Sequence, residues 1–154
     1  MKRLVMATWL AGALVSPAAA LEVWQGDLFV TAATAACAQA GVGVNDFFRA
    51  VYRPRNVEDN GPDTRLSLFS SRSAHRVVVE NGALAGNGNY TGLQLTSTTG
   101  VETYNGVFAG ATVTPASPTP NTQTVVVRVT LRTFTGEAGC NATLNGSLGN
   151  RPNL

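Results

Sequence analysis

The feature that most constrains the fold is a regular alternation of apolar and polar residues, clearest in the segment 124–134. Its alternate apolar positions are Val125, Val127, Val129 and Leu131. Arg128, Thr130 and Arg132 lie between them. Because successive side chains of a strand point to opposite faces, this pattern predicts a strand with one buried and one solvated face.

Similar patterns recur along the chain, separated by turn residues such as Asn81-Gly82 and by the proline-rich stretch Pro115–Asn121. The eight predicted strands are Val23–Ala32, Asp46–Arg53, Arg65–Ser70, Ala74–Glu80, Tyr90–Thr96, Val101–Val113, Thr124–Phe134 and Cys140–Leu148. Short strands with short connections predict an all-β fold, a small antiparallel barrel of about eight strands. A two-sheet β-sandwich is the alternative. The stretch 31–40 is predicted either as a helical turn or as a continuation of the first strand.

The first twenty residues have the pattern of a cleaved secretory signal peptide: a basic start, an apolar run from Leu4 to Val15, and small residues up to Ala20. Cleavage there leaves one all-β domain, residues 21–154, and no later apolar run is long enough to predict a membrane-spanning helix. We expect an exported protein, periplasmic or extracellular.

The net charge of +2 comes from Lys2 and Arg3, so the mature chain is neutral, which argues against a nucleic-acid partner.

The chain contains two cysteines, Cys37 and Cys140. In an exported protein they predict one disulfide, which closes the barrel by joining an early segment to the last one. A metal site would have to be built from carboxylates around the single histidine, so neither a metal nor a cofactor is expected.

Two candidate binding sites follow from the strand pattern. Arg49, Arg53 and Arg55 follow one another on a predicted strand and its end, in a spacing suited to gripping a carboxylate, sulfate or phosphate. The alternative is neutralisation of these arginines by the nearby acids Glu58, Asp59 and Asp63.

The second candidate is an apolar lumen. If the barrel is hollow, the side chains of Val125, Val127, Val129 and Leu131 line a pocket for a small hydrophobic molecule. If side chains fill the barrel, a surface that recognises a protein or a glycan is the alternative.

Catalytic signals are sparse. His75 is the single imidazole and has no Gly-x-Ser-x-Gly motif beside it, and Asp27 is a mid-strand acid predicted to face outward. We therefore expect a non-enzymatic domain with a binding or an envelope or extracellular structural role. One alternative is a small exported hydrolase that uses two carboxylates, or His75 with a carboxylate. Another is a protein–protein interaction module that pairs through a sheet edge.

Trp24-x-Gly26 at the start of a predicted strand resembles the opening of ligand-binding barrels of the lipocalin and avidin kind, with the order of the two residues reversed. The resemblance implies a small-ligand barrel and carries no binding position across. An early and a late cysteine in an exported β-domain are similar to those of chaperone–usher pilins, but the last seven residues lack an alternating donor strand.

Overall fold

A computed structural model describes residues 22–54, 62–96 and 100–151. The proposed signal peptide, residues 1–20, and the candidate anion ligand Arg55 lie outside these ranges, as do Glu58 and Asp59.

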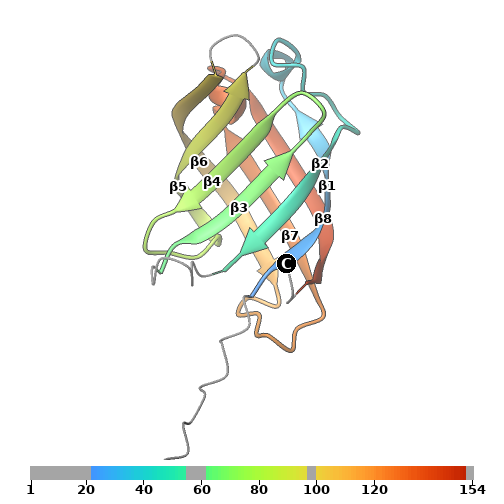
Figure 1. Cartoon of the computed structure of the whole chain (residues 1–154). Coiled ribbons are helices and arrows are strands. Elements are labelled where there is room, and N and C mark those ends of the chain that lie inside the picture. Colours follow the sequence, from blue (N-terminus) through green and yellow to red (C-terminus); the bar gives the residue numbers. More distant parts are fainter. Residues whose placement is uncertain (1–21, 55–61, 97–99, 152–154) are drawn as a thin grey trace, which may run out of the picture.

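Eight antiparallel strands form a closed barrel in which each strand pairs with the next in sequence and the last pairs with the first (Figure 1). The strands are β1 (Trp24–Ala33), β2 (Phe47–Arg53), β3 (Thr64–Phe69), β4 (Ala74–Val79), β5 (Gly86–Thr96), β6 (Gly100–Thr114), β7 (Thr124–Arg132) and β8 (Asn141–Asn150). The predicted barrel is confirmed, and the sandwich alternative is wrong, because β1 and β8 meet along their length and close the sheet.

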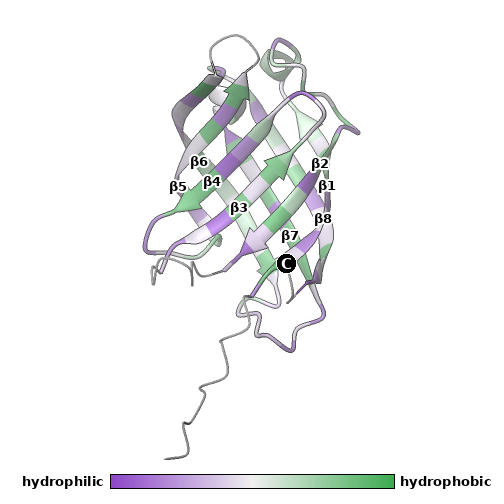
Figure 2. Ribbon diagram, in the orientation of Figure 1, coloured by the Kyte–Doolittle hydropathy of each residue, from purple (hydrophilic) through white to green (hydrophobic). Residues whose placement is uncertain are grey.

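Alternation along the strands divides each one between the barrel interior and its outer wall. Figure 2 shows apolar and polar residues following one another along the same strand. In β7 the predicted apolar positions are buried, whereas Arg128 and Arg132 are exposed. The inward side chains, from Trp24 in β1 to Leu148 in β8, form one continuous hydrophobic cluster. This burial is the main stabilisation of the barrel.

Glycines make room for aromatic rings inside the hairpin of β5 and β6. Three facing pairs each place a glycine opposite a ring: Gly88 with Phe108, Tyr90 with Gly106, and Gly92 with Tyr104. A Cβ atom at Gly106 would overlap the Tyr90 ring. These glycines therefore provide space for rings, and β6 bulges further along, between Ala109 and Thr112.

One end of the barrel carries the disulfide, and we call it the disulfide end. The connection after β1 contains the 3₁₀ helix η1 (Ala35–Ala38), and the connection between β7 and β8 contains η2 (Phe134–Gly136). Cys37 and Cys140 are joined by a disulfide, with their Cα atoms 4.5 Å apart. The prediction is confirmed. The ambiguous stretch 31–40 combines both interpretations, a strand to Ala33 followed by a short helix.

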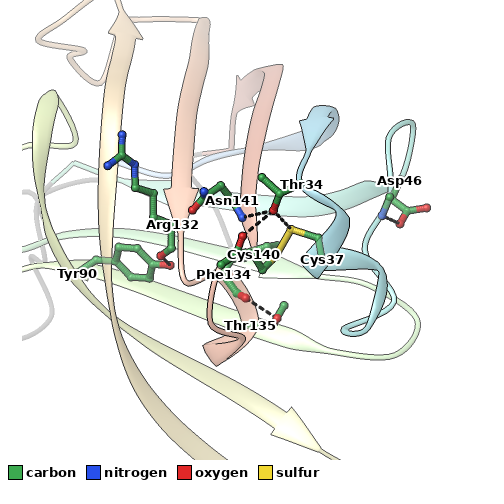
Figure 3. Close-up of a disulfide and its surroundings, with 11 residues drawn as sticks. Thr34, Cys37, Asp46, Tyr90, Arg132, Phe134, Thr135, Cys140 and Asn141 are labelled. Carbon is green, nitrogen blue, oxygen red and sulfur yellow. Dashed lines mark hydrogen bonds between the residues drawn. A yellow bond between two sulfur atoms is a disulfide. The ribbon is translucent and has the colours of Figure 1, made fainter.

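Thr34 holds the two connections together beside the disulfide (Figure 3). Its hydroxyl donates a hydrogen bond to the Gly139 carbonyl at 2.7 Å and accepts one from the Asn141 backbone N–H at 2.9 Å. The Thr34 backbone N–H donates to the Asn141 carbonyl at 3.0 Å. The disulfide is therefore flanked by hydrogen bonds that lead directly into the pairing of β1 with β8.

Candidate functional site

The residues predicted to line a lumen lie in the packed interior. Val125, Val127, Val129 and Leu131 have no exposed surface and belong to the continuous core cluster. Four open cavities of about 400–620 Å³ lie on the described structure, and none of these four is lined by Val125, Val127, Val129 or Leu131.

His75 points into the barrel near the disulfide end and is only 1% exposed. Its ring centroid lies 4.8 Å from that of Phe134 and 6.0 Å from that of Phe48. Nε2 is 2.8 Å from the Ser73 hydroxyl, and the buried Nδ1 has no hydrogen-bond partner. Burial lowers the pKa of His75 to about 4, so the ring is neutral and weakly basic at neutral pH.

This arrangement bears on the hydrolase alternative. A hydroxyl within hydrogen-bond reach of an imidazole is the start of a nucleophile–base pair, but a third group usually orients the base. No described residue orients the His75 ring in this way, because its buried Nδ1 has no hydrogen-bond partner. A general base also works best with a pKa near the working pH, which burial prevents here.

Asp27 lies on the outer wall of β1, as predicted, and pairs with an arginine of the adjacent strand. In the barrel register it faces Arg49 of β2, and its Oδ1 is 3.7 Å from Arg49 Nη1. Both side chains are well exposed, so the ion pair contributes little to stability. It does neutralise Arg49, one of the three predicted anion ligands. The third predicted neutralising acid, Asp63, instead accepts a hydrogen bond from the Asn81 backbone N–H at 2.9 Å.

A second predicted anion ligand, Arg53, lies in an open groove of about 400 Å³ on the outer wall of β1 to β5. We call it the arginine groove. Its cationic lining residues are Arg53, Arg65 and Arg76, and its apolar ones include Val51, Phe69, Leu93 and Leu95. Phe69 and Leu95 are 44% and 45% exposed. No Asp or Glu belongs to the lining in the described part of the chain.

Strand register explains why three arginines meet there. Arg53 faces Arg65 across β2 and β3, and Ser67, two positions along β3, faces Arg76 of β4. Neighbours on this diagonal are about 7–8 Å apart, within reach of long side chains. The small Ser67 and Ala74 leave the hollow between the larger side chains. Arg53 and Arg65 take part in other interactions as well, so neither is a free cation.

Sequence reasoning therefore found one of the three arginines of the groove. Arg65 and Arg76 were missed, although both occupy outward positions of predicted strands. Their parity along each strand was visible in the sequence. Their proximity depends on the pairing of β2, β3 and β4, which the sequence pattern does not specify.

No family model, curated protein or solved structure matches this chain. Within residues 22–54, 62–96 and 100–151, no three or more histidine, cysteine, aspartate or glutamate side chains are grouped as metal ligands. The helices of the described part are too short or too polar to cross a membrane. The disulfide is typical of an oxidising, exported compartment.

Proposed function

We propose that this protein is an exported binding domain, periplasmic or extracellular, that takes up a small amphipathic anion in the arginine groove. The observation that carries the proposal is the combination of a basic lining and an apolar floor in one hollow. A carboxylate, sulfate or phosphate would pair with Arg76, the most exposed arginine of the three, while an alkyl or aromatic body covers Phe69 and Leu95.

The size of the groove supports a small ligand. Its volume of about 400 Å³ lies at the lower end of the range common for small-molecule sites, about 300–1,000 Å³.

The other proposals have less support. A hydrophobic ligand in the lumen would have to displace core side chains that have no exposed surface. Hydrolysis by His75 would need a base with a pKa nearer neutrality and a group to orient its Nδ1.

The proposal is tested by calorimetric titration with octanoate, compared with octanol and acetate at the same pH and ionic strength. Octanoate should bind at least about tenfold more tightly than either, because it alone offers both an anion and an apolar body. Replacing Arg76 with Gln should weaken octanoate binding about fivefold or more. Arg128→Gln is the matched control, because Arg128 is an exposed arginine on the outer wall of β7, away from the groove.

Two results would overturn the proposal. One is the absence of octanoate binding at millimolar concentration. The other is equal weakening by Arg76→Gln and Arg128→Gln, which would assign the attraction to net charge and leave the groove without a role.

A further inference from the structure

Strand β6 extends past the end of its neighbour β7 at the disulfide end. β6 pairs with β5 from Gly100 onward, whereas its pairing with β7 begins at Val107, opposite Arg132. Residues 100–106, which we call the β6 overhang, therefore have a strand partner on one edge only within the described structure. One-sided pairing also occurs at other strand ends, such as residues 32–33 of β1, which pair with β8 alone, and residues 86–89 of β5, which pair with β6 alone.

The first part of the overhang, residues 100–103, is exposed on both of its faces, whereas Tyr104 is half-buried and Gly106 is buried. In most of the barrel, alternate strand residues are buried, but here Gly100, Val101, Glu102 and Thr103 are all exposed, and so is Asn105. Val101 is 58% exposed. An unpaired strand edge in contact with water is a template for a further strand, because its backbone N–H and C=O groups point outward.

The connection that contains η2 lies against the inner side of the overhang and does not pair with it. A Cβ atom at Gly136 would lie 3.5 Å from the Tyr104 side chain, so the two are in contact there. The loop's backbone hydrogen bonds close on itself: Phe134 N–H donates to the Cys140 carbonyl at 3.0 Å, and Cys140 N–H donates to the Glu137 carbonyl at 3.1 Å. Among the described residues, no hydrogen bond between backbone groups joins this loop to the overhang.

Beside this contact, a cavity of about 440 Å³ is lined by residues of both the overhang and the loop. Glu102, Thr103 and Tyr104 line one side. Thr135, Gly136 and Glu137 line the other, and Gln39 and Gln94 also contribute. Two carboxylates and no lysine or arginine belong to the described lining, although Glu102 also interacts with another group and is not a free charge.

We infer that the β6 overhang accepts an extended segment of a partner protein as an added strand, with a basic side chain of that segment between Glu102 and Glu137. The backbone groups of residues 101–105 provide the pairing, which is the usual basis of strand addition. The two carboxylates select for a lysine or arginine by charge complementarity. This surface is separate from the arginine groove, and the inference does not depend on the proposed function.

The test uses a synthetic nine-residue peptide of alternating threonine and valine with a central arginine. Amide hydrogen exchange of the full-length protein is followed by NMR with and without this peptide. We expect slower exchange confined to residues 101–105, together with shifts at Glu137. A peptide with the same side chains but N-methylated at alternate residues should give no protection, because it lacks the N–H groups that strand pairing needs.

Charge selection is tested with a second peptide, in which glutamate replaces the central arginine, and with two protein variants. Glu102→Arg should weaken binding of the arginine peptide at least about fivefold and strengthen binding of the glutamate peptide. Glu80→Arg is the matched control, since Glu80 is an exposed acid that follows β4 at the opposite end of the barrel. Octanoate binding should be unchanged in both variants, so failure at one surface is distinguishable from failure at the other.

Three outcomes would overturn the inference. The N-methylated peptide could bind as tightly as the parent, which would remove the role of the backbone. Glu80→Arg could weaken binding as much as Glu102→Arg does, which would leave only net charge. Residues 101–105 could be protected without peptide in a concentration-dependent way, which would mean that a second copy of the chain covers the edge.

Discussion

At the residue scale, the fold strongly changes the chemistry of His75. Two phenylalanine rings surround it, one hydrogen bond to Ser73 satisfies Nε2, and burial lowers its pKa from 6.5 to about 4. The folded barrel therefore holds the neutral ring, while the unfolded chain releases it to water, where it takes up a proton below about pH 6.5. The arrangement couples the stability of the disulfide end to acidity.

The sign of this coupling follows from proton binding. Between pH 6.5 and about 4 the unfolded chain binds a proton at His75 that the folded barrel does not, so acid favours unfolding. The contribution of His75 is complete above pH 6.5, and about 3 kcal/mol of it is lost by the time the pH reaches 4. Urea unfolding at pH 7.5 and 4.5 measures the loss.

His75→Phe is the control for this prediction, because phenylalanine fills the site without titrating. Its free energy of unfolding should fall less than that of the natural protein between the two pH values, by roughly 2–3 kcal/mol. Carboxylates titrate in both proteins, so the difference isolates the histidine. Equal losses in the two proteins would contradict the prediction.

At the scale of elements, the β5–β6 hairpin depends on the pairing of glycines with aromatic rings. The Tyr90 ring lies over Gly106, and its hydroxyl donates a hydrogen bond to the Arg132 carbonyl at 3.1 Å, which links β5 to the end of β7 (Figure 3). Tyr90 and Tyr104 also meet edge to face, with ring centroids 6.0 Å apart. The glycines are required here for space.

Gly106→Ala should therefore destabilise the barrel by roughly 1–3 kcal/mol, the usual range for overpacking, because the added methyl group overlaps a ring held at its far end. Gly149→Ala in β8 is the matched control. Its Cβ would meet the Gln25 carbonyl oxygen at 3.9 Å, an ordinary contact, and its effect should stay within about 0.5 kcal/mol. Chemical denaturation of both variants decides the matter, and similar effects would show that lost glycine flexibility, and not the ring, explains the change.

At the scale of the whole molecule, the disulfide closes a loop that contains every strand from β2 to β7. Cys37 and Cys140 are 103 positions apart, and the bond joins the two connections that flank the β1–β8 closure. On the chain-entropy model a loop of this length stabilises the folded state by about 4–5 kcal/mol. Closure of the sheet and closure of the loop thus support the same topology.

Replacing both cysteines with alanine should lower the free energy of unfolding by about 4 kcal/mol, with some further loss because both sulfur atoms are fully buried. Equilibrium unfolding in urea measures the change. The natural protein under a strong reductant should show a similar loss, and peptide mapping without reductant should recover the Cys37–Cys140 pair. Equal stability of the oxidised protein and the double variant would mean that the strand pairing alone determines the closure.

The strands, the inward face of β7 and the disulfide were predictable from the sequence, because side-chain period, turn residues and a single possible cysteine pair act locally or without alternatives. The arginine groove and the β6 overhang were not, because both depend on which residues face each other across strands. Arg76 joins Arg53 and Arg65 only through the register of β2, β3 and β4. The overhang exists because β6 extends past the end of β7, and how far it extends depends on the register between the two strands.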